Sequence, residues 1–382
     1  MRILFLIREL DVRGGTHKQL LKLLDYTAGC GIDFTVVTFC VDYTKTYPGF
    51  RKYSNHIKLF PPKRPWFLKI KGVKKYYSLY QKMVLRWMAR RADVVNIHDN
   101  GLDNLIPILA DKKIIWQIND LPYYPGDSKR AVDDNENMMP RCKKIFERNL
   151  KCITDITVNV SKNAERLKKY YGRDAHVFYC GVEPLEILRD NLTFNRFSQK
   201  KIHLLSSGVF FEYRNYETQI EAVDLLVKRG YDVELRIIGD TKYSPEYVNR
   251  IKRLISGKGL QSKIHIEGNV AEKRFKELHQ SADIFLFINI DQSWGLAVFE
   301  AMSCGLPVIV SKSVGATEVL QDRTNAIFVE PTNTIEITDE IEKLVIDQSY
   351  YKNISSHALA FPRTMTWEDS YCSKMLDLMS RV

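Results

Sequence analysis

The amino-acid sequence predicts an α/β protein built from two doubly wound, Rossmann-like domains. Short apolar runs alternate with amphipathic segments along almost the whole chain, a pattern typical of parallel sheets covered by helices. A polar and poorly periodic stretch at 186–200 interrupts the alternation once, near the middle. A glycine follows an apolar run in each half, at Gly14-Gly15 and at Gly295. These observations predict one strand–helix domain on either side of the interruption.

In the first half, six apolar runs are expected to form strands, and three amphipathic segments are expected to form helices. The helices are predicted near 18–28, near 140–150, and after Ser161, whose hydroxyl is expected to cap a helix that stops at Gly172. The strands are predicted at Ile3–Ile7, Phe34–Phe39, Val94–Ile97, Ile114–Ile118, Ile156–Val160 and His176–Tyr179.

The second half repeats the alternation, with helices expected between five strands. A last amphipathic helix, near Thr366–Leu378, follows a loop that contains Pro362. The strands are predicted at Ile202–Ser206, Val233–Ile238, Lys263–Glu267, Ile284–Ile288 and Val308–Val310.

Composition limits the class of protein. The 382 residues suffice for two or three domains, and an apolar fraction of 45% is ordinary for a globular chain. Seven scattered cysteines without a C-x-x-C pair argue against a disulfide framework or a zinc site and favour a reducing compartment. The N-terminal apolar run is too short for a signal peptide, and no run reaches the length of a membrane span. We therefore expect a soluble or peripheral protein.

The segment 284–310 carries the most specific pattern. An apolar run leads through a polar loop and Gly295 into a helix with Glu300 in its second turn, and Pro307 starts the next apolar run. The start of such a helix offers backbone N–H groups and a positive dipole end to a phosphate. Glu300, one turn further on, is placed to accept hydrogen bonds from ribose hydroxyls. The pattern predicts one half of an α/β nucleotide site, although an ordinary βαβ unit would have a similar sequence.

This segment resembles the sugar-nucleotide-binding signature of the retaining glycosyltransferases of family 4. Glu300 matches the second glutamate of that signature, and Gln292 falls at the position of the first. The residues that follow the second glutamate also match, at Ala301, Met302, Gly305, Pro307 and Val308.

Weaker matches to the same family extend over nearly the whole chain. Gly14 and Gly15 resemble its first glycine loop, Gly208 the loop that opens the second domain, and Gly268 with Val270 a loop beside the nucleotide base. Arg214 falls at the position of a lysine that neutralises the donor pyrophosphate, and an arginine does this well through its forked donors. Val209 replaces a second phosphate-binding arginine, and Asn119 replaces a histidine near the transferring sugar.

The resemblance implies the two-domain arrangement called GT-B, with the two Rossmann-like domains facing each other across a cleft. Residues 1–185 would bind the acceptor, 186–200 would link the domains, and 201–364 would bind the nucleotide sugar. The last helix, about 365–382, would pack back on the N-terminal domain. His98, Asp99 and Asp120 would lie on the acceptor side; a satisfied surface histidine is the alternative interpretation of His98.

The activity implied is retaining transfer of a sugar from a UDP- or GDP-linked donor to a glycan or lipid-linked glycan, as in cell-surface polysaccharide synthesis. Asn119, Arg214 and Gln292 are the candidate catalytic residues. The donor would also be held by the glycine loops, by Glu300, and by the N–H groups of Gly295, Leu296 and Ala297. No metal and no separate cofactor are expected, because no D-x-D-like pair is well placed. The departures at Asn119, Val209 and Gln292 leave two alternatives open: a non-catalytic relative of the same fold and a sugar-nucleotide epimerase.

The positive charge is confined to one segment. The net charge is +11, yet residues 51–91 hold thirteen basic residues and no acid, so the remaining chain sums to −2. Aromatic residues such as Trp66 and Trp87 are interleaved with them, a composition typical of a segment on an anionic membrane. We expect a cytoplasmic protein that is peripheral on the inner face of the cell membrane. The patch would include Lys69, Lys71, Lys74 and Lys75.

Two other interpretations of this basic segment stay open. Its apolar residues can instead face the domain core, on a solvated helix. Nucleic acid is not expected as a partner, because no nucleic-acid-binding pattern accompanies the segment.

Overall fold

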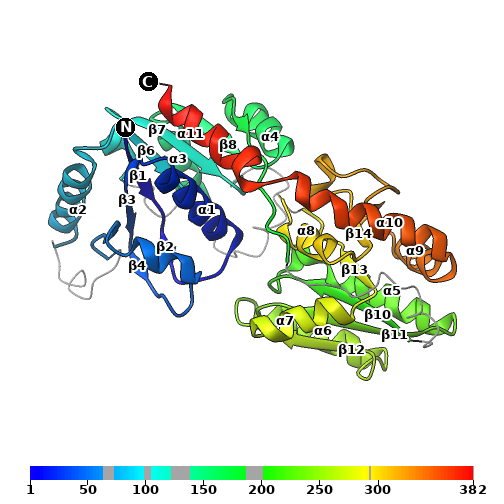
Figure 1. Ribbon diagram of the computed structural model, residues 1–382. Coiled ribbons are helices and arrows are strands. Elements are labelled where there is room, and N and C mark those ends of the chain that lie inside the picture. Colours follow the sequence, from blue (N-terminus) through cyan, green and yellow to red (C-terminus); the bar gives the residue numbers. More distant parts are fainter. Residues whose placement is uncertain (63–72, 99–104, 122–137, 186–200, 292–293, 382) are drawn as a thin grey trace. The chain divides into compact units, whose positions relative to one another are not determined.

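The computed structural model (Figure 1) describes residues 1–62, 73–98, 105–121, 138–185, 201–291 and 294–381. The chain divides into two compact units. The N-terminal unit comprises Met1–Gly126, Asp133–Gly181 and Trp367–Val382, and Val182–Thr366 makes up most of the C-terminal unit. The predicted linker at 186–200 lies outside the described residues.

The N-terminal unit is built on a seven-stranded sheet in the order β5-β3-β1-β6-β7-β8-β9, in which every neighbouring pair is parallel. The central strands are made mostly of β-branched and other apolar residues because both faces of a parallel sheet are buried. The strands are β1 (Arg2–Leu6), β3 (Asp33–Thr38), β5 (Ile57–Leu59), β6 (Val94–Ile97), β7 (Lys113–Ile118), β8 (Asp155–Val158) and β9 (His176–Val177). A separate short pair joins β2 (Glu9–Leu10) to β4 (Cys40–Val41).

Helices pack on this sheet and complete the core of the unit. They are α1 (Gly15–Gly29), α2 (Val73–Ala89), α3 (Met138–Leu150), α4 (Ser161–Tyr171) and α11 (Ser373–Ser380), with short helical turns at Pro48–Tyr53, Ile106–Leu109 and Glu368–Cys372. Leu4, Val95, Trp116 and Val158 lie in one buried cluster with residues of these helices, including Leu85 of α2 and Phe146 of α3.

The C-terminal unit is built on a six-stranded parallel sheet in the order β12-β11-β10-β13-β14-β15. Its strands are β10 (Lys201–Ser207), β11 (Asp232–Ile238), β12 (Ile264–Gly268), β13 (Ile284–Phe287), β14 (Val308–Ser311) and β15 (Ile327–Val329). Its helices are α5 (Tyr216–Lys228), α6 (Pro245–Gly257), α7 (Glu272–Ser281), α8 (Leu296–Ser303), α9 (Thr334–Ile346) and α10 (Gln348–Ala360), with short turns at Glu212–Arg214, Gly315–Glu318 and Phe361–Thr364.

The predicted fold class is confirmed, because both units are doubly wound α/β structures with parallel sheets. Local details differ from the prediction. Ser161 is the first residue of α4 rather than its cap, and the N-cap, Val160, makes no side-chain hydrogen bond. The helix does stop at Gly172, which has a left-handed φ of 65°. The last predicted helix begins as a π-helical turn at Glu368–Cys372 before it continues as α11.

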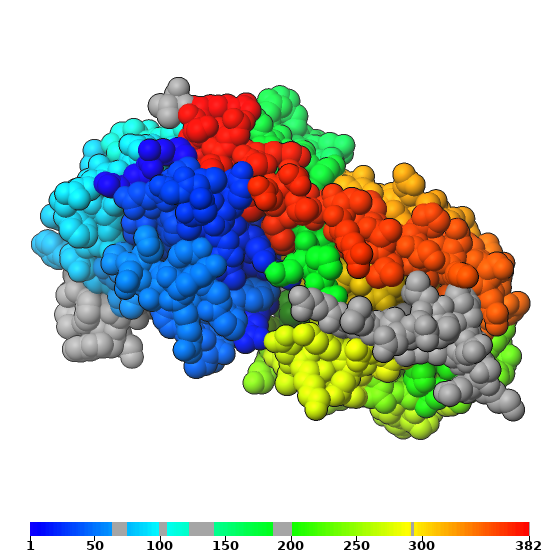
Figure 2. Space-filling view, viewed as in Figure 1, coloured from blue at the N-terminus to red at the C-terminus, as the bar shows by residue number. Residues whose placement is uncertain are grey.

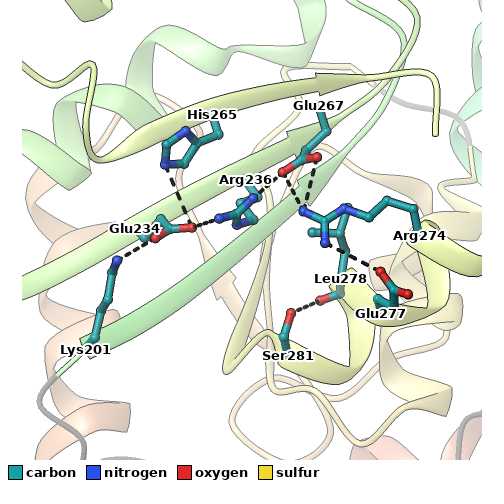
Figure 3. Close-up of polar contacts among 9 residues, drawn as sticks. All are labelled: Lys201, Glu234, Arg236, His265, Glu267, Arg274, Glu277, Leu278 and Ser281. Carbon is teal, nitrogen blue, oxygen red and sulfur yellow. Dashed lines mark hydrogen bonds and ion pairs between the residues drawn. The ribbon is translucent and has the colours of Figure 1, made fainter.

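A network of ion pairs ties strands β10, β11 and β12 of the C-terminal sheet to α7 (Figure 3). Arg236 on β11 bridges Glu234 at 2.5 Å and also pairs with Glu267 on β12. Lys201 of β10 reaches Glu234 at 2.6 Å, and Arg274 of α7 reaches Glu267 at 3.2 Å. Burial alone raises the pKa of Glu234 and of Glu267, but the hydrogen bonds and charges of these cations outweigh it and lower the pKa of both groups.

This network predicts a loss of stability in acid. A carboxyl group with a folded-state pKa below its unfolded value stabilises the fold above the unfolded value, near 4.5, and that contribution disappears as the pH falls through the folded pKa. At pH 7, Glu267→Gln should lower the free energy of unfolding by about 2 kcal/mol, and the difference from wild type should shrink below pH 4.5. Urea unfolding between pH 3 and pH 7 measures both. Glu272→Gln, at an exposed pair with Lys276, is the matched control and should change little. A difference for Glu267→Gln that stays constant with pH would contradict this explanation.

Candidate functional site

Three loops meet at the carboxyl ends of β10, β11 and β12, the edge at which sheets of this class bind ligands. Gly208 donates its N–H to the carbonyl of Ile238 at 2.8 Å, and Gly239 donates to the carbonyl of Gly268 at 3.0 Å. A Cβ at Gly239 would lie 1.8 Å from the carbonyl oxygen of Gly208, so only glycine permits this approach. Gly268 also has a left-handed φ of 69°. The loops therefore expose backbone, with few side chains, at the ligand edge.

Arg214 lies directly over the first of these loops. A Cβ at Gly208 would lie 2.8 Å from both Cζ and Nε of Arg214, which shows how closely the guanidinium covers that glycine. The guanidinium is 5.1 Å from the ring centre of Tyr213 and 5.7 Å from that of Phe287. Its Nε is buried without a hydrogen-bond partner, and no carboxylate within the described ranges forms an ion pair with it. A cation left in this state is suited to bind an anionic ligand.

The N-terminus of α8 lies against the same aromatic ring. Gly295 is the N-cap, with φ of 87°, and α8 begins at Leu296. A Cβ at Gly295 would lie 3.0 Å from Cε1 of Phe287 and 3.1 Å from Cγ1 of Val314. Phe287 therefore sits close to both the Arg214 guanidinium and the start of α8. The positive end of the helix dipole and the Arg214 cation both border the ring, an arrangement that favours a phosphate group.

Glu300 occupies the second turn of α8, as predicted, and is half-buried. Its backbone carbonyl accepts a hydrogen bond from Ser303 Oγ at 2.7 Å. Leu296 and Ala297, also half-buried, form the first turn, and Val270 is half-buried beyond β12. Gln292 lies outside the described residues, so its predicted role stays a prediction.

In the N-terminal unit, Asn119 follows β7 and is held by three side-chain hydrogen bonds. Its Nδ2 donates to Thr16 Oγ1 and to Gln19 Oε1, both at 2.9 Å, and its Oδ1 accepts from Gln117 Nε2 at 2.9 Å. Thr16 and Gln19 belong to the first turns of α1, whose N-cap is Gly14 and whose first residue is Gly15. The predicted glycine loop and the asparagine thus lie at one place in this unit, joined through α1.

Gln117, which donates to Asn119, is itself held by a chain of buried polar side chains. The Oε1 of Gln117 accepts from Thr157 Oγ1 at 2.7 Å and from the hydroxyl of Tyr371 at 3.2 Å. That hydroxyl also lies 3.4 Å from Nε2 of His98. Tyr371 belongs to the C-terminal segment of the chain, so this segment contributes to the support of the site.

His98 is part of this buried chain and is only 1% exposed, so the alternative of a surface histidine is wrong. Burial, with a smaller contribution from His17, lowers the pKa of His98 to about 3, which keeps the ring neutral at ordinary pH. Asp120, next to Asn119, is exposed, and Asp99 lies outside the described residues.

Sequence reasoning missed three residues that define this geometry: Phe287, Gln117 and Tyr371. Gly239 lies in the segment 237–240, which the family resemblance placed, together with 267–270, beside the nucleotide base. Phe287 and Tyr371 are apolar or amphipathic residues inside ordinary core patterns, and nothing in the sequence sets them apart.

Two other features of the chain concern metals and membranes. Within the described residues, no group of three or more His, Cys, Asp and Glu side chains is arranged to hold a metal ion. Among the helices in those ranges, none combines the length and the hydrophobicity that crossing a bilayer requires.

Comparison with known proteins identifies the family of the C-terminal unit. Residues 189–360, a little under half of the chain, match the family described as glycosyl transferases group 1. The match supports the prediction of a group 1 glycosyltransferase for the C-terminal unit, and family 4 stays a prediction. A serotype-specific mannosyltransferase, WbdA of Escherichia coli, is 24% identical over 271 residues, which are 70% of this chain but 31% of that protein. A D-inositol 3-phosphate glycosyltransferase of Xylanimonas cellulosilytica is 21% identical over 72% of this chain and 66% of its own length. The chain thus spans less than two thirds of these relatives.

Solved structures show the same fold over the whole chain. The structure of Anabaena HepE in complex with UDP and glucose has a TM-score of 0.76 at 15% identity, with 100% of both chains covered. The structure of WaaG, a glycosyltransferase involved in lipopolysaccharide biosynthesis, has a TM-score of 0.71 at 16% identity, again over 100% of both chains. At such identities the likeness establishes the fold alone.

The contact between Gly239 and Gly208 predicts a strong effect of one methyl group. Gly239→Ala should lower the free energy of unfolding by at least about 2 kcal/mol, because its Cβ would overlap the backbone of the neighbouring loop. The matched control is Gly257→Ala, where no heavy atom lies within 4 Å of the added Cβ. The free energy of unfolding of Gly257→Ala should lie within about 0.5 kcal/mol of the wild-type value, or slightly above it. Urea unfolding measures the free energy of unfolding of both variants. Equal values would show that the fold does not need the close contact between Gly239 and Gly208.

Proposed function

We propose that this chain is a retaining glycosyltransferase of the group 1 family that transfers a sugar from a nucleotide-diphosphate donor to a glycan or lipid-linked glycan. One observation carries the proposal. The Arg214 cation, without a carboxylate partner in the described residues, and the N-terminus of α8 both border Phe287 at the carboxyl edge of the C-terminal sheet. Two positive sources at one place are suited to a diphosphate, and HepE, a protein of the same fold, was solved in complex with UDP.

The donor would lie along the loop edge in a defined order. Its diphosphate would meet Arg214 and the N–H groups of Gly295, Leu296 and Ala297. Its ribose hydroxyls would donate to the Glu300 carboxylate, one turn further along α8. Its base would face the exposed backbone around Gly239, Gly268 and Val270, where main-chain groups supply donors and acceptors. Either a UDP- or a GDP-linked sugar satisfies this arrangement.

In the reaction, the bond between the anomeric carbon and the diphosphate oxygen breaks, and a bond from the acceptor oxygen forms on the same face. The proton of the acceptor hydroxyl passes to the departing diphosphate. The negative charge that develops there would be stabilised by Arg214 and the α8 N-terminus, which are already in place before the reaction. Because these groups supply the positive charge, the proposed reaction is metal-independent.

Neutral amides would position the sugar. Asn119 is held by three hydrogen bonds and retains acceptor capacity on Oδ1, so it can orient a hydroxyl group without carrying charge. Gln292 would contact the donor sugar through an amide that both donates and accepts, which favours a role in donor choice. Asp120, and Asp99 outside the described residues, would face the acceptor. The buried His98 would support Gln117 through Tyr371 without touching the acceptor.

The proposal places the protein in family 4 and at the inner face of the cell membrane, where a lipid-linked acceptor is available. A non-catalytic relative is the competing function, favoured by the unusual residues Asn119 and Gln292. An assay for release of the nucleoside diphosphate separates them: with a panel of UDP and GDP sugars and mixed glycan acceptors, only the enzyme releases it.

Glu300→Ala should weaken nucleotide binding on the order of a hundredfold, because a charged hydrogen bond contributes about 1.5–3 kcal/mol and two ribose hydroxyls are available. Titration calorimetry with UDP and GDP measures the affinity, and thermal unfolding checks that the fold survives. Glu246→Ala, at an exposed position in the first turn of α6, is the control and should bind like wild type. An unchanged affinity in Glu300→Ala would end the assignment of the ribose to this carboxylate.

A further inference from the structure

Helix α2 has two different faces, and one of them is anchored in the N-terminal unit. Leu85 and Ala89 are fully buried in the core of that unit. Further along the same side, the hydroxyl of Tyr77 donates to the carbonyl of Pro62 at 2.7 Å, and Gln81 Nε2 donates to that of Pro61 at 3.1 Å. This side fixes the rotation of the helix about its axis.

The other face is apolar and uncovered. Five large apolar side chains on it are between 52% and 75% exposed, and they recur at the spacing of one helical stripe. They are Tyr76, Leu79, Tyr80, Met83 and Trp87. Thirteen large apolar side chains are exposed in the described part of the chain, and five of them lie on this one helix. We call these five residues the apolar stripe; in Figure 2 the α2 segment, in light blue, forms part of the outer surface of its unit. The interpretation that the apolar residues of α2 face the domain core therefore holds for Leu85 and Ala89 but not for the apolar stripe.

A row of cations borders the apolar stripe. Lys75, Lys82, Arg86 and Arg90 are exposed and follow one another at helical spacings of seven, four and four residues. Arg86 pairs with Asp111 at 3.6 Å, and the Arg90 guanidinium lies 5.0 Å from the ring centre of Trp87. Lys75 and Lys82 form no ion pair within the described residues. The sequence from 51 to 91 contains no acid that would neutralise the row.

We propose that α2 is an interfacial helix that lies flat on a bilayer of anionic lipids. The apolar stripe would enter the boundary between headgroups and acyl chains, where tyrosine and tryptophan are favoured, and the cations beside it would contact lipid phosphates. The proposal deepens the proposed function by naming the surface on which a lipid-linked acceptor is met, and it rests on that function only for the identity of the acceptor. The patch predicted at Lys69, Lys71, Lys74 and Lys75 is extended by residues of the helix itself. Lys69 and Lys71 lie outside the described residues, and the side chain of Lys74 is likewise not described.

Charge decides against a second copy of this chain as the occupant. In a twofold dimer the same patch meets itself, so two apolar stripes in contact would bring two rows of cations together. Like charges facing each other in this way disfavour such a dimer. A layer of lipid phosphates has the opposite sign and extends along the whole helix. An acidic protein would also have the right charge, and the experiment below separates it from lipid.

The test is sedimentation of the full chain with vesicles of phosphatidylcholine, alone or with phosphatidylglycerol. Wild type should bind the mixed vesicles at low salt, bind the neutral ones weakly, and lose binding as salt increases. Met83→Ser/Trp87→Ser should reduce the partition coefficient by at least about tenfold through lost apolar burial. Lys82→Glu/Arg90→Glu should reduce it by more than about twentyfold, since each cation contributes roughly fivefold.

Matched controls lie on the C-terminal unit. Ile335→Ser/Ile346→Ser removes two exposed apolar side chains of α9, and Lys252→Glu/Arg253→Glu reverses two exposed cations of α6. Both should bind vesicles like wild type. All variants should unfold at the wild-type temperature, because the changed side chains are exposed.

Two outcomes would overturn the proposal. The first is a wild-type protein that ignores anionic vesicles at low salt, which would leave an acidic protein as the partner of α2. The second is an equal loss of vesicle binding in the α2 variants and in the controls, which would show that the binding does not depend on α2. Nucleotide binding measured on the same samples keeps the two proposals apart: vesicle binding without nucleotide binding refutes the proposed function alone, and the reverse refutes the interfacial helix alone.

Discussion

The close approach of backbone at Gly208, Gly239 and Gly268 is the constraint on which the candidate donor site depends. The carbonyl of Gly208 occupies the space in which any other residue at 239 would place its Cβ. Because the loops meet without side chains between them, Arg214 can lie across Gly208. The α8 N-terminus reaches the same region by a second small-residue contact, at Gly295 against Phe287. Sheet geometry brings the strand ends together, and the glycines decide how close their loops come.

The N-terminal unit uses a different principle, in which buried polar groups satisfy one another. Asn119 is fixed by α1 on one side and by Gln117 on the other, and Gln117 is fixed in turn by Thr157 and Tyr371. The chain of contacts ends at a neutral His98. Burying a protonated histidine without a carboxylate partner would be costly, and a neutral network avoids that cost. An amide at 119 fits this pattern because it can complete the network without a charge.

Sequence patterns predicted the elements of the fold well and their contacts poorly. The strands around Ile3, Val233 and Val308 appear within one or two residues of their predicted limits, since continuous apolar runs are required in a sheet buried on both faces. The positions of Gly295, Glu300 and Arg214 in the fold were also predicted, because the motif fixes their spacing, and their roles stay predictions. The contact between Gly239 and Gly208 joins two strand ends far apart in sequence, so no local pattern reveals it. For Trp87 the sequence favoured a membrane-facing position but left the domain core as an alternative, because a helix with apolar residues on two faces does not indicate which one faces the core; the exposed ring decides between them.

The affinity of nucleoside diphosphates and monophosphates, in wild type and in Arg214→Met, tests the central claim about the donor site most directly. If Arg214 and the α8 N-terminus bind the diphosphate, UDP or GDP should bind wild type more tightly than its monophosphate. The methionine variant should then lose diphosphate affinity by about ten- to a hundredfold while monophosphate affinity changes little. Arg214→Lys should restore part of the loss, because a lysine keeps the charge without the forked geometry. Equal binding of diphosphate to wild type and Arg214→Met would contradict the assignment of this edge to the donor pyrophosphate.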